Sequence, residues 1–260
     1  MEVVFAKYQG TGNDFIMLDN LDGTYNKLSL AQVIRLCDRR FGVGADGLIR
    51  INAATNYDFE VDYFNSDGSK SFCGNGARCA VAFAETLGVP VAHTNFMAMD
   101  GEHRAFKLNG SVKLEMKDVL HIEQLGSDYI LDTGSPHYVH LTEEMEKEDI
   151  RSFGKKIRFS ERFHSQGINV NLLEEKDRDH ISIATYERGV EDETLSCGTG
   201  ATACAIVYGA LKRREGLHEI LVDVKGGQLQ VGFSYDPANG FTGVSLTGPA
   251  EFVFSGKIRI

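Results

Sequence analysis

The sequence predicts an α+β fold of two similar domains, each a mixed β-sheet or barrel wrapped around one central helix. One motif occurs twice, at residues 73–82 and 197–206: a cysteine, a Gly-x-Gly-Ala turn and a run of small residues. In each half that run is suited to a buried helix, and most of the remainder alternates as strands do. Strands and helices do not alternate regularly along the chain, which disfavours a doubly wound Rossmann fold.

Size and charge narrow the class of protein. A chain of 260 residues with 42% hydrophobic and 25% charged residues can form a sizeable core, as one domain or as two of about 130 residues. Its net charge of −10 argues against nucleic acid or an anionic membrane as a partner. No apolar run approaches the roughly 18 residues of a membrane span, and the first residues do not resemble a signal peptide. We therefore expect a cytoplasmic protein.

The five cysteines are not expected to form a disulfide framework, because their number is odd. The absence of Cys-x-x-Cys argues against a zinc ribbon or a thioredoxin-type site. Cys37, Cys79 and Cys204 are expected to be small buried hydrophobes. Cys73 and Cys197 differ, because each directly precedes a Gly-x-Gly.

Elements of the first half are predicted in order from local patterns. Ser29 caps a helix that runs to Cys37, and a second helix runs from Cys73 to Thr86 with Gly88 as its C-cap. Asp100-Gly101 is the signature of a hairpin turn. Strands are predicted at residues 3–8, 15–19, 48–51, 57–64, 94–99, 104–108 and 111–117.

The second half repeats this plan. A charge-rich surface helix is predicted at residues 143–155, and a buried helix continues from Cys197 to Arg214. The acidic segment 190–194 is expected to be a loop. Strands are predicted at residues 129–132, 138–141, 167–171 and 181–186, followed by several short ones. The domains are expected to cover residues 1–118 with 249–260, and residues 119–248.

A cysteine at a helix N-terminus lies beside backbone N–H groups that have no intrahelical partner. Such an end carries roughly half a positive charge, binds carboxylates and lowers the pKa of a thiol. Two such ends facing each other repel unless an anion lies between them. An amino acid there would have its carboxylate held by amides and one sulfur on each side of its α-carbon. One thiolate could remove the α-proton while the other thiol donates one, without metal or pyridoxal phosphate. His137 and Glu187 lie in loops from which they could assist.

Three segments closely resemble the corresponding segments of diaminopimelate epimerases, and the resemblance extends over nearly the full length of the chain. They are residues 12–15, Gly-Asn-Asp-Phe; residues 64–79, from Phe-Asn-Ser-Asp-Gly to the first cysteine motif; and residues 187–201, from Glu-Arg-Gly to the second. The resemblance implies a cofactor-independent and metal-free epimerase that interconverts L,L- and meso-diaminopimelate, in lysine and peptidoglycan precursor biosynthesis. It also implies a homodimer, a site in the cleft between the domains, and a last strand that returns to the first domain.

Matched residue by residue, the resemblance places proton transfer on Cys73 and Cys197 and assistance on His137 and Glu187. The substrate contacts that it implies are Asn13, Asn65, Gly74, Asn75, Asn169, Glu187, Arg188, Gly198 and Thr199. The chain departs from the pattern at Ser135, where many relatives have Asn and where the shorter side chain leaves room for a water. It departs also at Gly47, where some have Gln, and in an acidic loop that is one residue longer.

Other functions stay open on the sequence alone. Proline racemases share the cysteine pair, but they characteristically have His where this chain has Asn75. Isomerases of the phenazine type lack the pair. A thiol redox protein would use a Cys73–Cys197 disulfide, although Cys-x-x-Cys is absent. A non-catalytic amino-acid binding protein would not exchange the α-hydrogen of its ligand.

Overall fold

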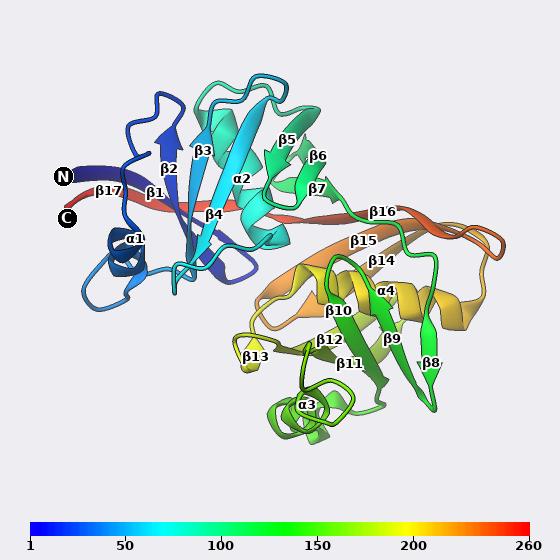
Figure 1. The fold of residues 1–260 in the computed structure, drawn as a ribbon. Coiled ribbons are helices and arrows are strands. Elements are labelled where there is room, and N and C mark those ends of the chain that lie inside the picture. Colours follow the sequence, from blue (N-terminus) through cyan, green and yellow to red (C-terminus); the bar gives the residue numbers. More distant parts are fainter. The chain divides into compact units, whose positions relative to one another are not determined.

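The computed structural model describes residues 1–260 and divides into two compact units (Figure 1). Unit 1 contains residues 1–114 and 248–260, and unit 2 contains residues 115–247. The predicted domains, residues 1–118 with 249–260 and residues 119–248, stay a prediction, since a compact unit is not by itself a domain. No helix has both the length and the apolar character that a membrane crossing needs.

Unit 1 is a mixed sheet that curls around helix α2 (Gly74–Thr86). The helix packs against β1, β2, β3, β4 and β6, and its residues 74–84 are buried. In order across the sheet, its strands are β17 (Glu251–Arg259), β1 (Glu2–Gly10), β2 (Asn13–Asn20), β3 (Gly47–Asn52), β4 (Phe59–Asn65), β5 (Thr94–Ala98), β6 (Gly101–Leu108) and β7 (Ser111–Glu115). Neighbouring strands pair antiparallel, except for the third pair, β2 with β3, and the fifth, β4 with β5, which are parallel.

Unit 2 curls in the same way around α4 (Gly198–Lys212), which packs against β9, β10, β11, β12, β14 and β15. Its strands follow the same sequence of antiparallel and parallel pairings. In order they are β8 (Glu123–Leu125), β9 (Asp128–Asp132), β10 (Pro136–Leu141), β11 (Asn169–Asp177), β12 (His180–Glu187), β14 (Gly216–Val224), β15 (Gly227–Asp236) and β16 (Gly240–Pro249). The repeat predicted from two short motifs therefore extends over eight strands and a helix.

This correspondence identifies equivalent positions in the two units. Helix α2 corresponds to α4, so Cys73 corresponds to Cys197. Strand β2 corresponds to β10, so Asn13 at the start of one and His137 near the start of the other occupy similar places. The duplication was apparent from the sequence. That Asn13 and His137 occupy equivalent positions becomes apparent only from the strand order.

The first and last strands lie side by side in unit 1 (Figure 1). Strand β17 pairs with β1 from Glu2 opposite Arg259 to Gln9 opposite Glu251, with one irregularity at Lys7/Tyr8. The amino group of Met1 donates to the carbonyl oxygen of Ile260. The last strand thus returns to the first unit, as the family resemblance implied.

Both central helices and α1 (Leu30–Cys37) confirm their predicted starts. Ser29 forms a capping box with Gln32 at the start of α1. Helix α2 ends at Thr86 as predicted, but its C-cap is Leu87 and not the predicted Gly88. Gly88 follows with a φ of 84°, a left-handed conformation that suits glycine. Cys37, Cys79 and Cys204 are buried, as predicted.

Two local predictions in unit 2 are wrong. The helix expected at residues 143–155 is instead a short 3-10 turn, η1 (Met145–Lys147), and a separate helix, α3 (Ile150–Arg158). Asp149 breaks it, because its carboxylate caps the N–H groups of Arg151 and Ser152 from an extended backbone. The predicted acidic loop contains a strand, β13 (Asp192–Thr194), which pairs with β12. Strand β8 was not predicted.

Candidate active site

The half-site in unit 1 is built on the N-terminus of α2. Cys73 is the N-cap residue, with an extended backbone at φ −137° and ψ 115°. Its Sγ accepts a hydrogen bond from the backbone N–H of Gly76 at 3.4 Å. The thiol therefore occupies the position that a Ser or Asp usually takes at a helix start, where a partial negative charge on the side chain is favoured.

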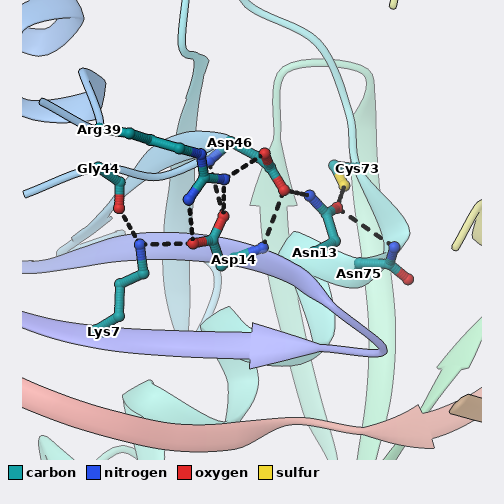
Figure 2. A network of polar contacts seen from close by, with 8 residues as sticks. All are labelled: Lys7, Asn13, Asp14, Arg39, Gly44, Asp46, Cys73 and Asn75. Carbon is teal, nitrogen blue, oxygen red and sulfur yellow. Dashed lines mark hydrogen bonds and ion pairs between the residues drawn. The ribbon is translucent and has the colours of Figure 1, made fainter. Parts of the chain in front are cut away.

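Two amide side chains lie beside this sulfur (Figure 2). The Oδ1 of Asn13 is 3.5 Å from the Sγ of Cys73, which is placed to donate to it. The same oxygen accepts a hydrogen bond from the Nδ2 of Asn75 at 3.3 Å. Asn13, Cys73 and Asn75 were each predicted as site residues, and the structure brings all three into direct contact.

A cluster of charged groups lies behind Asn13 (Figure 2). The Nδ2 of Asn13 donates to Asp46 at 2.7 Å, and Asp46 also accepts from Arg39 at 2.8 Å. Arg39 holds Asp14 with two hydrogen bonds of 3.0 and 2.7 Å, and Lys7 lies 2.8 Å from the same carboxylate. Burial by itself raises the pKa of Asp14, but the hydrogen bonds from Arg39 and Lys7 outweigh it and hold the pKa well below its usual range.

A buried cation lies on the other side of the amide pair. Arg78 of α2 is fully buried, and its Nη2 donates to the Oδ1 of Asn75 at 2.9 Å. Its Nε donates to the carbonyl oxygen of Pro249 at 3.4 Å, and its Nη1 has no partner. No carboxylate forms an ion pair with Arg78. Desolvation by burial lowers the pKa of its guanidinium.

The half-site in unit 2 is built in the same way on α4, with Cys197 as the N-cap residue. Its Sγ is 3.5 Å from the Oγ1 of Thr199, which is in turn 2.9 Å from the Nε2 of His137. The hydroxyl of Ser135 lies 3.0 Å from that nitrogen and 3.1 Å from Thr199. Ser135 thus links His137 and Thr199; the water expected beside its short side chain stays a prediction.

Hydrogen bonding defines the tautomer of His137. The carbonyl oxygen of Tyr138 can only accept, so the amide of Asn171 presents its Nδ2 there at 2.9 Å. The same Nδ2 donates to the Nδ1 of His137 at 3.1 Å, and the Oδ1 accepts from the hydroxyl of Thr185. An Nδ1 that accepts leaves the ring hydrogen on Nε2. His137 is fully buried, and this burial, reinforced by the charge of Arg188, lowers its pKa to about 3. The ring is therefore neutral at pH 7 and donates from Nε2 toward the hydroxyls of Ser135 and Thr199.

The remaining predicted residues lie around these two centres. Asn169 on β11 donates to Ser135 at 3.1 Å, and its Oδ1 accepts from the backbone N–H of Arg188 at 2.9 Å. The guanidinium of Arg188 donates to the carbonyl oxygen of Gln166. Glu187 is the last residue of β12 and is half-buried. Asn65 ends β4, and its amide bonds Ser69 and Ser71 in the loop that leads to Cys73, not Cys73 itself.

Four residues that shape the half-sites escaped sequence reasoning: Asp46, Arg78, Asn171 and Thr185. Asn171 had a signal, because Asn169 and Asn171 are two apart in a strand and therefore share one face. Arg78 had one as well, since it is the only charged residue in a run of small residues. Asp46 and Thr185 had none, because their roles depend on partners 14 to 33 residues away in the sequence.

Solved structures define the class of fold. The chain superposes on a Bacillus anthracis phenazine biosynthesis protein of the PhzF family with a TM-score of 0.80, 13% identity and 100% of both chains covered. It superposes on a hydroxyproline epimerase from Agrobacterium vitis with a TM-score of 0.68 and 14% identity, covering 99% of this chain and 92% of that one. The fold is therefore the duplicated α+β fold that these proteins share.

Sequence comparison defines the family within that class. The diaminopimelate epimerase family model matches twice, at residues 5–128 and 129–253. The diaminopimelate epimerase of Flavobacterium psychrophilum is 46% identical over 97% of this chain and 98% of its own length. That of Chlorobaculum tepidum is 40% identical over 96% and 99%. The chain belongs to the diaminopimelate epimerase family. The proline racemase alternative is thereby set aside, because the likeness to such structures is one of fold alone.

Proposed function

We propose that this chain, an isomerase of the diaminopimelate epimerase family that serves lysine biosynthesis, interconverts L,L- and meso-diaminopimelate through a cysteine pair. Cys73 and Cys197 would lie on opposite sides of the α-carbon, one thiolate removing the α-proton while the other thiol delivers one to the opposite face. One observation carries this proposal: both halves of a duplicated fold place a cysteine at the N-cap of their central helix.

The first turns of both helices would hold the α-carboxylate. Backbone N–H groups at a helix start lack intrahelical partners, and those of Gly74, Asn75, Gly198 and Thr199 are of this kind. As the α-proton leaves, negative charge spreads onto the carboxylate. Amides already oriented toward it stabilise that charge without reorganisation, which is often the largest contribution to catalysis.

His137 would tune Cys197 through Thr199. Because Nε2 carries the ring hydrogen and lies 2.9 Å from the Oγ1 of Thr199, that hydroxyl is free to direct its own hydrogen at the Sγ of Cys197, 3.5 Å away. Such a contact stabilises the thiolate. The neutral His137 would therefore assist by orienting a hydroxyl and would not itself take the substrate proton.

The remaining predicted contacts would recognise the substrate. Diaminopimelate carries a second amino-acid group at its far end, and Arg188 has a planar fork suited to a carboxylate. The roles of Asn65, Asn169 and Glu187 in binding the amino and carboxylate groups are part of the same proposal. So is the absence of any cofactor or metal from the reaction.

We further propose that the enzyme is a cytoplasmic homodimer. The half-exposed apolar side chains of Val4 on β1 and of Val253 on β17 support association, because these two strands pair with each other. Sedimentation of the wild-type chain and of Val253→Glu tests this: a dimer that becomes a monomer in the variant is expected, and a monomeric wild type would contradict the proposal.

The central test is proton NMR of L,L-diaminopimelate in D₂O with wild type, Cys73→Ala and Cys197→Ala. Wild type should exchange the α-proton for deuterium and produce the meso isomer, while each variant should fail to produce it. Cys79→Ala is the matched control, because Cys79 is a buried cysteine on the same helix as Cys73. Epimerisation by either single variant at more than a small fraction of the wild-type rate, with the fold intact by circular dichroism, would refute the two-base mechanism.

A further inference from the structure

We propose that Asp46 and Arg78 are positioning residues, which together hold the amide of Asn13 so that its oxygen, and not its NH₂ group, faces the sulfur of Cys73. The two charges anchor opposite ends of a chain of hydrogen bonds that runs Asp46, Asn13, Asn75, Arg78 (Figure 2 shows the first three). The inference rests on the proposed function only in giving Cys73 a catalytic role.

The argument from the first end is chemical. An ionised carboxylate can only accept hydrogen bonds. Asp46 lies 2.7 Å from the amide of Asn13, so the amide must present its Nδ2 there. The Oδ1 of Asn13 is then directed to the other side, toward Cys73 and Asn75. Arg39 and the backbone N–H of Asp14 also donate to Asp46 and keep its carboxylate in place.

The argument from the second end is independent and agrees. A guanidinium can only donate. Arg78 lies 2.9 Å from the amide of Asn75, so that amide must present Oδ1 to the cation and Nδ2 to Asn13. An Nδ2 needs an acceptor, and the oxygen of Asn13 is that acceptor. Both anchors therefore require the same orientation of Asn13.

This orientation gives the sulfur one contact for each of its protonation states. The N–H of Gly76 donates to Sγ and favours the thiolate, whereas the oxygen of Asn13 accepts from S–H and favours the thiol. An unanchored amide would turn its NH₂ group toward the thiolate and trap it, which would weaken Cys73 as a base. Anchoring keeps both states accessible, as a residue that gives and takes a proton in turn requires.

The charged and titratable surroundings of Cys73 are compatible with this role. Arg78 and Cys79 lie on its own helix. Burial raises the pKa of Cys79 to about 12, so Cys79 is a neutral thiol. Three more charged groups are linked to Cys73 indirectly, through Asp46 and Asn13. They are Lys7 of β1, Asp14 of β2 and Arg39 of the loop after α1. Tyr63 of β4 and Cys73 line one small cavity, and His103 of β6 stacks on Phe72, the residue before Cys73.

Unit 2 shows that the fold does not itself require a cation at this place. Thr202 occupies the position equivalent to Arg78, five residues after its cysteine, and its hydroxyl bonds the carbonyl oxygen of Gly198 within its own helix. A buried guanidinium that lacks a carboxylate partner costs stability. Its presence in one repeat and not in the other indicates a requirement specific to Cys73.

The test is a double-mutant cycle of Asp46→Asn and Arg78→Met, read by the pH midpoint of Cys73 alkylation with iodoacetamide. Peptide mass spectrometry follows Cys73 and Cys197 in the same sample. Loss of the cation alone should raise the midpoint for Cys73, and loss of the anion alone should lower it. In the double variant the two charge effects oppose each other, so the remaining shift reports chiefly the freed amide.

We expect the double variant to move the Cys73 midpoint down by about half a pH unit or more, since one hydrogen bond to the thiolate is gained. The rate constant kcat/KM should fall by about tenfold or more, and the Cys197 midpoint should not move. Arg78→Lys keeps a donor cation and should therefore retain most of the wild-type Cys73 midpoint and kcat/KM, in contrast to Arg78→Met. Thr202→Val is the matched control and should change neither midpoint.

A double variant that has the wild-type midpoint and kcat/KM would overturn the inference. So would equal shifts at Cys73 and Cys197, because these would indicate a loosened fold. Thermal melting checks the fold directly. Failure of the proposed function is distinguishable, since it appears as activity of Cys73→Ala, whereas failure of this inference alone leaves Cys73→Ala inactive and the double variant normal.

Discussion

At the scale of single residues, the two half-sites treat equivalent cysteines differently. The sulfur of Cys73 faces an amide oxygen, whereas that of Cys197 faces the hydroxyl of Thr199. An amide oxygen can only accept a hydrogen bond, but a hydroxyl can donate or accept. The environment of Cys197 can therefore follow its protonation state by rotation of one O–H bond, while that of Cys73 depends on anchored groups.

His137 makes folding sensitive to acid. Its pKa in the folded protein is lowered from 6.5 to about 3, first by burial. Below pH 6.5 the unfolded chain takes up a proton that the folded protein does not, so this group lowers stability as pH falls toward 3. We expect the contribution to reach roughly 2 kcal/mol at pH 5.

Urea unfolding at pH 7 and pH 5 measures this difference. His137→Gln should lose a corresponding part of the decrease, and His121→Gln, at an exposed position, should retain it. An equal decrease in wild type and His137→Gln would show that His137 is not held neutral.

Arg188 is expected to be intolerant of a change that keeps its charge. If its fork binds the distal carboxylate with two hydrogen bonds, Arg188→Lys should lower kcat/KM with L,L-diaminopimelate by tenfold or more, because Lys offers a point charge only. Steady-state kinetics over a range of substrate concentrations measure the effect. An unchanged kcat/KM would mean that another group binds that carboxylate.

At the scale of elements, the second glycine after each cysteine meets different neighbours. A Cβ added at Gly200 would lie 2.6 Å from the Oδ1 of Asn171, the residue that defines the tautomer of His137. A Cβ added at Gly76 would meet the ends of Ile49 and Phe15 at 3.1 and 3.3 Å. Side-chain ends can give way by a few tenths of an ångström, whereas Asn171 is held by three hydrogen bonds.

We therefore expect Gly200→Ala to lose most of its activity and about 2 kcal/mol of stability. Gly76→Ala should retain its fold within about 1 kcal/mol, because the helix propensity that Ala gains offsets the crowding. Turnover and thermal melting of the two variants, measured side by side, provide the comparison. Equal effects in both would indicate that Asn171 can move aside.

At the scale of the whole molecule, the proposed mechanism requires Cys73 and Cys197 to approach one α-carbon from two sides. Mild oxidation without substrate should then inactivate the enzyme by linking these two cysteines, and dithiothreitol should restore it. A disulfide needs Cα atoms about 4.4 to 6.8 Å apart, so the units must close further than a bound substrate allows. Substrate should therefore protect.

Non-reducing peptide mapping identifies the linked pair. Cys79→Ala should still cross-link, because Cys79 is buried within unit 1. If a different pair of cysteines is linked, the two cysteines do not share one site. The same holds if the enzyme is inactivated without a cross-link and substrate does not protect it.

The features that could be predicted from the residues alone depend on short-range interactions. A cysteine before Gly-x-Gly-Ala and a run of small residues encodes a buried helix within a dozen neighbouring positions. Both central helices could therefore be predicted, each with a cysteine at its start. The repetition of that segment was enough to predict two similar domains. The helix predicted at residues 143–155 is wrong for a reason that is also local: Glu and Lys favour a helix, but the carboxylate of Asp149 caps a new helix start within the segment.

The surroundings of each sulfur depend instead on contacts between segments that are far apart in the chain. Asn13 reaches Cys73 across 60 residues, and Asn171 reaches His137 across 34, through the register of neighbouring strands. Moving a strand by one residue turns its side chains to the other face, and short-range patterns do not specify which strands become neighbours. The anchoring of Asn13 by Asp46 and Arg78 depends in addition on burial, because a carboxylate and a guanidinium direct an amide only where water does not compete for its hydrogen bonds.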